Sequence, residues 1–381
     1  MKETELSGYR KKILILTTEF PPGPGGIGNH AYNLSDFLNR SNIEVKVITA
    51  SDFTDESAEK KFDEKQNYRV IRFKRYDSRI RTYRERLKII SEEVSSENFT
   101  HIIFSGRFSL YASLFLKKFK DKIKFIAIAH GGDINAGNIT EKYFITKALK
   151  QMDLIIPVSE YSKTKLPSGI SDSKIKVIHN GFNFEKMDTL MLRNKAESKD
   201  QLTLVSVGTV WPRKGHHNVL KAFEEILKVY PEVKYNIAGR LADLSKVKEY
   251  FDDKNLKDHL NIAGQVTNEE LHNILRDSDI FILLSESQSS GDFEGFGIAV
   301  LEANHFGLPA IGSKNSGLED AIKNGVSGIL VDPKNTKEIC NAITEIKNNY
   351  PFYSEGARKW SASHHWSEII KSYINEIEKL N

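Results

Sequence analysis

Residues 11–38 read KKILILTTEFPPGPGGIGNHAYNLSDFL: an apolar run, then a loop rich in proline and glycine, then the periodicity of an amphipathic helix. This order is typical of a β-α unit, in which the loop after a parallel strand contacts the ligand. Gly23, Gly25 and Gly28 also match the G-x-G-x-x-G fingerprint of dinucleotide-binding proteins. That fingerprint holds its first glycine tightly against the strand, however, and three prolines make this loop longer and stiffer than such a turn allows.

The glycine-rich loop leaves three interpretations open. It can bind a nicotinamide dinucleotide, contact another ligand, or turn the chain without binding anything. Gly25 and Gly26 lack side chains, which lets backbone N–H groups at the start of the next helix approach an anion or a sugar hydroxyl. Motifs in the second half of the chain are needed to distinguish these interpretations.

The pattern of the opening segment repeats along the whole chain. Apolar, β-branched runs alternate with helical periodicity, as in β-α units around a parallel sheet. We expect strands at residues 12–18, 44–50, 68–73, 101–105, 124–130, 154–159, 174–180, 202–208, 234–240, 260–264, 279–285, 309–313 and 327–332, with helices between them, for example at 28–40 and 161–167. Because 381 residues exceed the usual size of one hydrophobic core, we predict an α/β fold of two Rossmann-like, doubly wound domains. They should join near residue 190 and face each other across a ligand-binding cleft.

The composition excludes several classes of protein. Hydrophobic residues make up 39% and charged residues 28% of the chain, as in an ordinary folded protein rather than a disordered one. The single cysteine, Cys340, cannot form an internal disulfide, which fits a reducing compartment. The apolar run ILIL after twelve mostly polar residues is too short for a signal peptide or a membrane span, so we expect a cytoplasmic protein. The net charge of +4 does not by itself indicate a nucleic-acid partner.

Two glutamates in the second half, Glu294 and Glu302, frame the stretch EGFGIAVLEA. After the flexible EGFG we expect a helix from about Ile298, so that both carboxylates lie near its N-terminal end. Free N–H groups near Gly297 and Ile298 are a ready site for phosphate. A carboxylate is repelled by phosphate, so its partners should be neutral hydroxyls such as those of a ribose or a hexose. This combination suits a nucleotide sugar, and an acid on an exposed helix face is the alternative for Glu302.

Two cations follow a strand of the same half. In VGTVWPRKG (207–215), Arg213 and Lys214 lie in a turn after a strand that we expect to end at Gly208. Their side chains can reach over the edge of the sheet toward a diphosphate. A solvated pair of surface cations is the alternative. The sequence has no convincing D-x-D metal motif, so we expect neither a metal ion nor a cofactor.

These segments resemble those of a known family. EGFGIAVLEA is similar to the E-x7-E motif of the GT-B retaining glycosyltransferases of family 4 (glycosyl transferases group 1), and VGTVWPRKG resembles the strand and basic loop that precede it there. Further segments occur in that family's order: FPPGPGGIGNHAYNL (20–34), HGGDI (130–134), VSEYSKTKL (158–166), HNGFN (179–183) and NIAGQVTNEELHNIL (261–275). The resemblance spans nearly the whole chain.

The resemblance implies a GT-B enzyme that transfers a hexosyl group from a UDP- or GDP-sugar to a glycan or lipid-linked acceptor, with retention of configuration. It implies a role in building cell-surface polysaccharide or glycolipid. Residues 1–188 would form the acceptor-binding domain and residues 189–365 the nucleotide-sugar-binding domain, with a C-terminal helix at 366–381 packing back onto the first. The alternatives are an NAD-dependent oxidoreductase, which leaves the paired glutamates without a task, and a non-catalytic nucleotide-sugar-binding protein.

The resemblance also implies roles for individual residues. Glu302 would bind the ribose, Glu294 the donor hexose, and the two cations the diphosphate. The predicted donor-binding residues are Gly26, Arg213, Lys214, Gln265, Val266, Glu294, Gly297, Ile298 and Glu302, and the predicted catalytic residues are His130, Asp133, Glu294, Lys214 and Arg213. Gln265 and Val266 would meet the base. The family commonly has an arginine where this chain has Thr209, so we expect one phosphate contact to be missing and Arg213 to replace it.

His130 and Asp133 match the family's position beside the donor sugar. His130 would hydrogen-bond a sugar hydroxyl or take part in proton transfer, because imidazole suits that work near neutral pH. A buried structural histidine is the alternative.

A basic stretch with interleaved aromatic and aliphatic residues lies at 72–90, in the half that should hold the acceptor. It includes Arg79, Arg81, Arg84 and Arg86. Such a segment can lie on anionic lipid, so we expect peripheral contact with the inner face of a membrane and no nucleic-acid partner. A solvated helix is the alternative.

Overall fold

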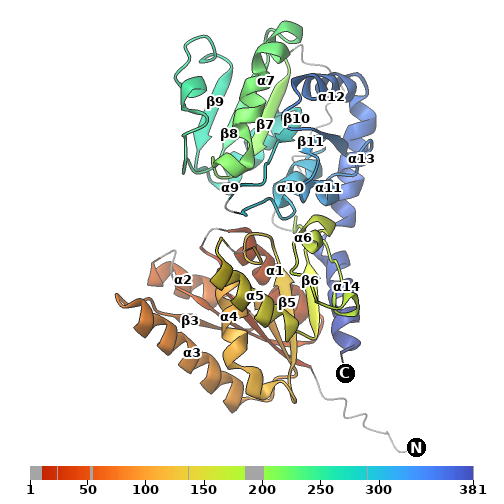
Figure 1. Cartoon of the computed structure of the whole chain (residues 1–381). Coiled ribbons are helices and arrows are strands. Elements are labelled where there is room, and N and C mark those ends of the chain that lie inside the picture. Colours follow the sequence, from red (N-terminus) through yellow and green to blue (C-terminus); the bar gives the residue numbers. More distant parts are fainter. Residues whose placement is uncertain are drawn as a thin grey trace, which may run out of the picture. The chain divides into compact units, whose positions relative to one another are not determined.

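The computed structural model describes residues 11–23, 25–51, 55–135, 137–184, 201–289 and 291–380. The chain divides into two compact units, and Figure 1 labels most of their helices and strands. Unit 1 comprises Met1–Pro157, Leu166–Ile178 and Ile369–Asn381, and unit 2 comprises Val158–Lys165 and His179–Glu368. The junction that the sequence predicts at residues 188–189 lies outside the described residues.

Unit 1 is built on a six-stranded parallel sheet. Its strands are β1 (Lys12–Thr17), β2 (Glu44–Ala50), β3 (Arg69–Phe73), β4 (His101–Ser105), β5 (Lys124–Ala129) and β6 (Leu154–Pro157). They lie in the order β3-β2-β1-β4-β5-β6, and Ile13 of β1 pairs with Val45 of β2 and His101 of β4. Because helices cover both faces of such a sheet, the strands are nearly continuous apolar runs. The predicted parallel sheet is confirmed for this unit.

The helices of unit 1 are α1 (Gly26–Arg40), α2 (Glu56–Asp63), α3 (Arg79–Ser96), α4 (Arg107–Phe115) and α5 (Ile139–Lys150), with 3-10 turns at Lys117–Phe119 and Asp172–Lys174. The last helix, α14 (Trp366–Glu378), contributes its residues from Ile369 onward to this unit. Tyr373 and Ile377 of α14 are fully buried. The carbonyl of Ile377 accepts a hydrogen bond of 3.2 Å from Lys11 Nζ, which ties α14 to the residue before β1.

The strand predicted at residues 174–180 is wrong. This segment makes a single parallel bridge, between Ile155 and Ile175, and donates two backbone hydrogen bonds to β6, from the amides of Lys176 and Ile178. Pro157 ends β6 and has no N–H to return, so the ladder stops there. The helix expected at 161–167 is the short α6 (Glu160–Thr164), which belongs to unit 2.

Unit 2 repeats the architecture of unit 1. Its strands are β7 (Thr203–Val207), β8 (Lys234–Ala238), β9 (Leu260–Gly264), β10 (Ile280–Leu283), β11 (Ala310–Ser313) and β12 (Gly328–Val331), in the order β12-β11-β10-β7-β8-β9. Its helices are α6, α7 (His216–Val229), α8 (Lys248–Phe251), α9 (Asn268–Asp277), α10 (Ile298–His305), α11 (Leu318–Ala321), α12 (Thr336–Asn348) and α13 (Tyr350–Ser363), with a 3-10 turn at Pro212–Lys214. The predicted Rossmann-like fold is confirmed for this unit as well.

The strand order places the candidate site residues. In each unit the first strand, β1 or β7, lies beside the fourth, β4 or β10, and the chain winds away from this pair in both directions. Open parallel sheets bind ligands at the carboxyl ends of strands where the winding direction reverses. The loops after these central strands are therefore the first place to look for chemistry.

Candidate active site

The basic loop after β7 is held against the end of β10. Residues Pro212–Lys214 form a 3-10 turn that Gly215 closes with φ 70° and ψ 21°. A Cβ atom on Gly215 would lie 1.6 Å from the carbonyl oxygen of Leu284, so only glycine fits there. The amide of Glu286 donates a hydrogen bond of 2.8 Å to the carbonyl of Arg213. These contacts fix the backbone that carries the two cations.

The side chains of this loop pair with acids from the segment after β10. Arg213 Nη1 donates to Glu294 Oε2 at 2.8 Å, and Lys214 Nζ donates to the same oxygen at 2.6 Å. Arg213 Nε lies 2.9 Å from Asp292 Oδ2. Burial alone would raise the pKa of Glu294, but the charges and hydrogen bonds of Lys214 and Arg213 outweigh it and hold this pKa at about 2. Glu294 is therefore a buried, ionised carboxylate that neutralises part of the loop's positive charge.

Helix α6 supports this acidic segment. Ser162 Oγ donates to the carbonyl of Gly295 at 3.2 Å, and the ring of Tyr161 packs edge-on against Phe293 with 5.3 Å between centroids. The two residues that flank Glu294 are thus both contacted by α6. This gives the VSEYSKTKL segment a positioning task that the sequence alone did not show.

Helix α10 begins at Ile298, as predicted, after Gly297 with φ 92°. Glu302 lies one turn into the helix and is half-buried. Burial raises the pKa of Glu302, and the nearby charge of Lys214 partly opposes that shift. The Glu302 carboxylate has no hydrogen-bond partner among the described residues, so its acceptor capacity is open to a ligand hydroxyl. Lys214 thus acts on both glutamates of the E-x7-E motif, through a hydrogen bond to Glu294 and through its charge near Glu302.

The two residues predicted to contact the nucleotide base of the donor have no recorded contact with this charged cluster in the described part of the chain. Gln265 and Val266 lie between the edge strand β9 and the Thr267 cap of α9, and Gln265 is exposed. No hydrogen bond or ion pair within the described ranges links either of them to Glu294 or Lys214. Their role stays a prediction.

In unit 1 a second cluster follows β4 and β5. Ser105 Oγ and His130 Nε2 are hydrogen-bonded at 2.8 Å, and the rings of His130 and His30 meet edge to face at 4.8 Å. His30 Nε2 in turn lies 2.9 Å from Tyr373 Oη. Burial lowers the pKa of His130 to about 3 and lowers that of His30 well below its usual value. Both imidazoles are therefore neutral near pH 7, which favours the hydrogen-bonding role of His130 over the proton-transfer role.

Asp133 closes the turn after His130. Its Oδ1 accepts hydrogen bonds from the amides of His130 at 3.0 Å and Gly131 at 2.8 Å. Burial nevertheless raises the pKa of Asp133 to about 6, against the opposing effect of those amides and of Arg107. Asp133 thus orients the loop that carries His130 and titrates closer to neutrality than an ordinary aspartate.

Glu19 is a residue of this cluster that sequence reasoning missed. Burial raises the pKa of its carboxylate, the amide of Gly28 lowers it, and the charge of Asp133 raises it further. A Cβ atom on Gly25 would lie 2.0 Å from Glu19 Oε2, whereas a Cβ on Gly26 would meet nothing within 4 Å. The glycine-rich loop therefore wraps around an acid, and the available signal was the acid itself, two residues after β1.

The structure thus brings together Arg213, Lys214, Glu294 and Glu302 in unit 2, and His130 with Asp133 in unit 1. Among the residues that the structure describes, no group of three or more His, Cys, Asp and Glu side chains is arranged to hold a metal ion. The expectation of a metal-independent reaction stays a prediction.

Two family models match adjoining parts of the chain. The model described as Glycosyltransferase Family 4 matches residues 24–186. The model described as Glycosyl transferases group 1 matches residues 189–363.

Individual relatives and solved structures agree with these models. A GDP-mannose-dependent monoacylated alpha-(1-6)-phosphatidylinositol monomannoside mannosyltransferase of Corynebacterium glutamicum is 22% identical over 346 residues, 88% of each chain. The amylovoran biosynthesis glycosyltransferase AmsK of Erwinia amylovora is 31% identical over 211 residues, 54% of this chain and 51% of its own. Sucrose-phosphate synthase from Thermosynechococcus elongatus has a TM-score of 0.77 at 17% identity, covering 97% of this chain and 99% of its own. HepE of Anabaena, solved with UDP and glucose, has a TM-score of 0.75 at 18% identity with the same coverage. The chain belongs to the glycosyltransferases of group 1, family 4, with their two-domain GT-B fold of Rossmann-like units.

Proposed function

We propose that this glycosyltransferase moves a hexosyl group from a UDP- or GDP-sugar to a glycan or lipid-linked acceptor, with retention of configuration and without a metal ion or cofactor. We place it in the biosynthesis of polysaccharide or glycolipid, in line with what several relatives are named for. The observation that carries the proposal is the cluster of Arg213, Lys214 and Glu294 at the carboxyl ends of β7 and β10.

The cluster suits the departure of a nucleoside diphosphate. During transfer the bond between the anomeric carbon and the diphosphate oxygen breaks, a bond to the acceptor oxygen forms, and the acceptor hydroxyl loses its proton. Negative charge develops on the leaving oxygen. Cations held in place beforehand stabilise that charge more in the transition state than in the ground state. Arg213 and Lys214 are held in this way by Glu294 and by the backbone contacts of their loop.

The two glutamates suit the neutral parts of the donor. A carboxylate accepts hydrogen bonds from hydroxyls and is repelled by phosphate. Glu302 carries a carboxylate without a protein hydrogen-bond partner in the described ranges, one helical turn from the N–H groups at the start of α10. We assign Glu302 to the ribose and Glu294 to the hexose, with backbone groups of Gly297 and Ile298 on the phosphates.

For the nucleotide base of the donor, guanine and uracil are both candidates. The corynebacterial relative is named as GDP-mannose-dependent, whereas HepE was solved with UDP and glucose. The binding experiment therefore tests both nucleotides. Unfolding temperature is measured with UDP, GDP and NAD, since a ligand that binds only the folded form raises apparent stability.

The decisive assay incubates the full chain with UDP- and GDP-sugars and follows release of the nucleoside diphosphate and the anomeric configuration of the product. We expect an α-linked product from an α-linked donor, and unchanged activity in EDTA. Lys214→Gln should lower kcat/KM by about 100-fold or more. Lys228→Gln, on the exposed side of α7, is the matched control and should stay within about twofold. A shift with NAD alone, or an inverted product, contradicts the proposal.

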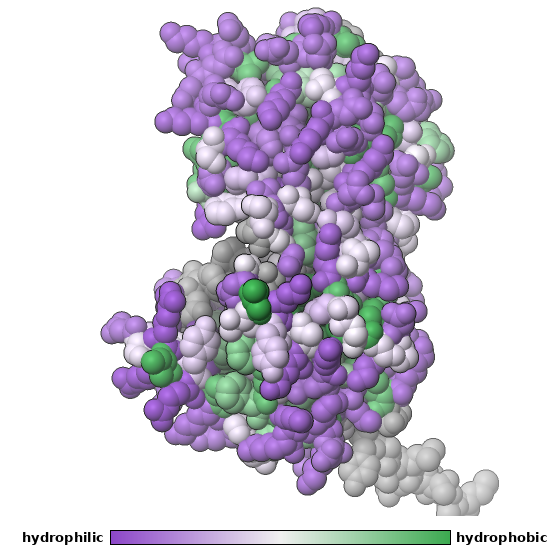
Figure 2. All heavy atoms as spheres, in the orientation of Figure 1, coloured by the Kyte–Doolittle hydropathy of each residue, from purple (hydrophilic) through white to green (hydrophobic). Residues whose placement is uncertain are grey.

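We also propose that the protein contacts an anionic membrane surface through α3. The exposed side of α3 carries Arg79, Arg81 and Arg84, together with Ile80 at 75% and Tyr83 at 50% exposure. A helix with cationic and apolar side chains on its outer face suits an anionic lipid surface. No helix in the described ranges is long and apolar enough to cross a membrane. Figure 2 shows predominantly hydrophilic residues on the face drawn, with hydrophobic ones standing singly among them.

Two arginines of the basic stretch do not belong to that surface. Arg86 is 8% exposed and stacks its guanidinium over the rings of Phe73 and Phe108. The side chain of Arg72 is 9% exposed and forms a two-pronged ion pair with Asp63. The charge available to lipid is therefore smaller than the sequence count implies.

The membrane test uses only the exposed arginines. Vesicles containing anionic lipid should bind the wild type, and serine at Arg79, Arg81 and Arg84 should weaken that binding by about 100-fold, at roughly 1 kcal/mol per charge. A second basic segment of unit 1, KKFKDKIK at 117–124, supplies the control, with serine at Lys117, Lys118 and Lys122. Equal binding by the arginine variant and the wild type would exclude α3 as the contact.

A further inference from the structure

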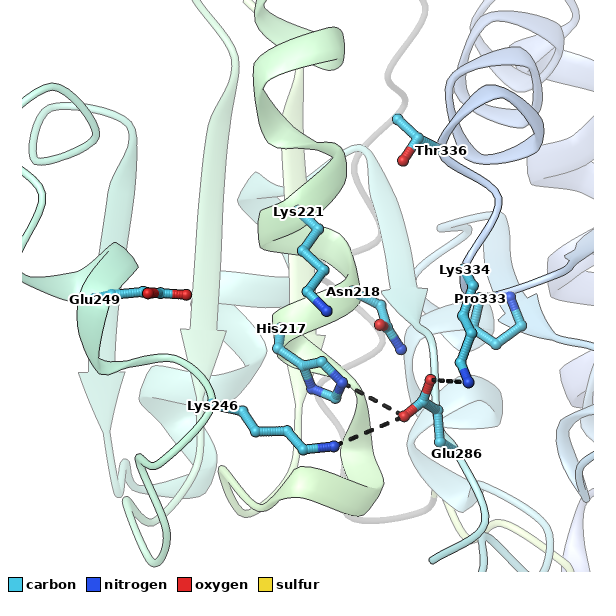
Figure 3. Close-up of a pocket in the computed structure, with 9 residues that line it drawn as sticks. All are labelled: His217, Asn218, Lys221, Lys246, Glu249, Glu286, Pro333, Lys334 and Thr336. Carbon is cyan, nitrogen blue, oxygen red and sulfur yellow. Dashed lines mark ion pairs between the residues drawn. The ribbon is translucent and has the colours of Figure 1, made fainter.

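A cavity of about 510 Å³ in unit 2 is lined by residues that the donor site does not use. Its lining comes from α7 with His217 and Lys221, the loop after β8 with Lys246, α8 with Glu249, the segment after β10 with Glu286, and the connection from β12 to α12 with Lys334. Figure 3 shows His217, Lys246 and Lys334 directed at the Glu286 carboxylate from different sides. The cavity is therefore organised around one acid.

Two lysines and His217 surround Glu286 without closing it in. Its Oε2 lies 3.4 Å from His217 Nε2 and 4.0 Å from Lys246 Nζ, and its Oε1 lies 3.8 Å from Lys334 Nζ. Charge-assisted hydrogen bonds are about 2.8 Å long. Glu286 Oε1 is buried and has no hydrogen-bond partner among the described residues. The carboxylate therefore keeps acceptor capacity for a donor that enters the cavity.

The lysines give the cavity an excess of positive charge over its acids. Lys221, Lys246 and Lys334 stand against Glu249 and Glu286 in the lining. Lys221 makes no ion pair with any described residue, and Figure 3 shows Glu249 on the opposite side of the cavity from Glu286. The side chains of Lys246 and Lys334 are 45% and 76% exposed, so both can adjust to a ligand. Ammonium groups on separate flexible stems suit a phosphate group.

We propose that this cavity binds a small phosphorylated sugar or polyol, with its phosphate on Lys221, Lys246 and Lys334 and its hydroxyls donating to Glu286. A polyanion without hydroxyls is repelled by the carboxylate, and a neutral sugar leaves the lysines without an anionic partner. A ligand that carries both groups satisfies both sides of the cavity. The volume also falls within the range of about 300 to 1,000 Å³ that is usual for small-molecule sites.

The cavity adjoins the basic loop through the backbone. The amide of Glu286 donates to the Arg213 carbonyl, while the Glu286 side chain faces the cavity. A ligand that draws Glu286 toward itself therefore acts on the segment that holds Arg213. Binding in the cavity does not depend on the proposed transfer reaction, and the experiment below measures no transfer, so the failure of one leaves the other standing.

The test is calorimetric titration of the full chain with glucose 6-phosphate, inorganic phosphate and glucose. We expect glucose 6-phosphate to bind with a dissociation constant of about 1 mM or tighter, inorganic phosphate at least about tenfold more weakly, and glucose not at all. The double variant Lys246→Gln/Lys334→Gln should lose about tenfold or more in affinity for glucose 6-phosphate. Glu286→Gln should weaken glucose 6-phosphate but not inorganic phosphate.

Two control variants separate this cavity from the donor site. Lys214→Gln removes a cation from the basic loop, and Lys228→Gln removes an exposed one from α7; neither should change the affinity for glucose 6-phosphate. The proposal is overturned if no phosphate compound binds saturably. It is also overturned if the double variant, shown by its melting curve to be folded, binds as tightly as the wild type, or if Lys214→Gln alone abolishes binding.

Discussion

The two units share one strand order, yet the side chains at the centres of their sheets differ in charge. In unit 2, Arg213 and Lys214 both donate to the ionised carboxylate of Glu294, at 2.8 and 2.6 Å. In unit 1, burial keeps His130 neutral and raises the pKa of Asp133 to about 6. The same scaffold therefore offers an ion-paired site in one unit and, in the other, a neutral imidazole beside an acid whose ionisation burial disfavours.

The physical reason lies in the partners that each buried group has. Burial disfavours the charged form of every ionisable group, and an opposite charge at hydrogen-bond distance reverses that effect. Glu294 has two such partners, whereas His130 is bonded to the hydroxyl of Ser105 and packed against the neutral His30. Strand order thus fixes where a site lies, and the residues after the strands decide whether it suits a diphosphate or neutral hydroxyls.

The sharpest test of this difference is one acid-to-amide change in each unit, which should act in opposite directions. Glu294→Gln leaves two cations with less compensation, so we expect a loss of about 2 to 3 kcal/mol in the free energy of unfolding at pH 7. We also expect kcat/KM to fall by about 100-fold or more. Calorimetric unfolding and donor kinetics measure the two effects.

The pH dependence of Glu294→Gln follows from a lowered pKa. The folded-state pKa of Glu294 is about 2 against a usual 4.5, so its contribution to stability is fully present above pH 4.5 and is lost as the pH falls toward 2. The difference in unfolding free energy between wild type and variant should shrink over that window. A difference that stays constant from pH 7 to pH 3 would contradict the ion pair.

Asp133→Asn in unit 1 should stabilise the fold near neutral pH. The folded-state pKa of Asp133 is raised from 3.8 to about 6, so the stability that it provides below pH 3.8 is lost as the pH rises through 6. Asparagine avoids that loss, and its oxygen can still accept from the amides of His130 and Gly131. We expect a gain of about 1 to 3 kcal/mol at pH 7 and none at pH 3.5. A variant less stable than wild type at pH 7 would show that Asp133 is paired as an ion.

His130→Asn should change the rate without changing its pH profile. Because burial lowers the pKa of His130 to about 3, kcat/KM should show no inflection near pH 6.5 that belongs to this residue. Losing one neutral hydrogen bond to the substrate should cost about tenfold in kcat/KM. Ser105→Ala is the companion variant, since it removes only the partner of the imidazole. An inflection near pH 6.5 in the wild type that disappears in His130→Asn would restore the proton-transfer role.

The sequence predicted the features that depend on local pattern. The start of α10 follows from the glycines before Ile298 and the apolar periodicity after it, and the basic loop follows from a strand that ends before a Pro and a Gly. The pairing of Glu294 with Arg213 was not predictable, because the two lie 81 residues apart and meet only through the packing of β7 beside β10. Each was assigned to the donor alone, whereas the structure also pairs them with each other.

The sequence of the basic stretch contains a signal for the burial of Arg86 that the prediction did not use. Thr82, Arg86, Ile90 and Val94 recur every four residues and form the buried side of α3. That spacing places Arg86 on the inner face, although counting charges along 72–90 placed it on the surface. The burial of Arg72 had no such local signal, because its acidic partners come from α2.

The smallest expected effect comes from placing an arginine at position 209, where the family resemblance leads us to expect one. Arg213 and Lys214 face Glu294 and Asp292, so the four formal charges of the cluster cancel. Thr209→Arg adds a cation to a balanced cluster at the end of β7, which should tighten donor binding about three- to tenfold at low salt, with a smaller gain at high salt. Thr209→Gln adds comparable length without charge and is the control. If both variants bind donor equally, the gain owes nothing to charge, and the neutral balance of the unit 2 cluster does not limit its affinity for a diphosphate.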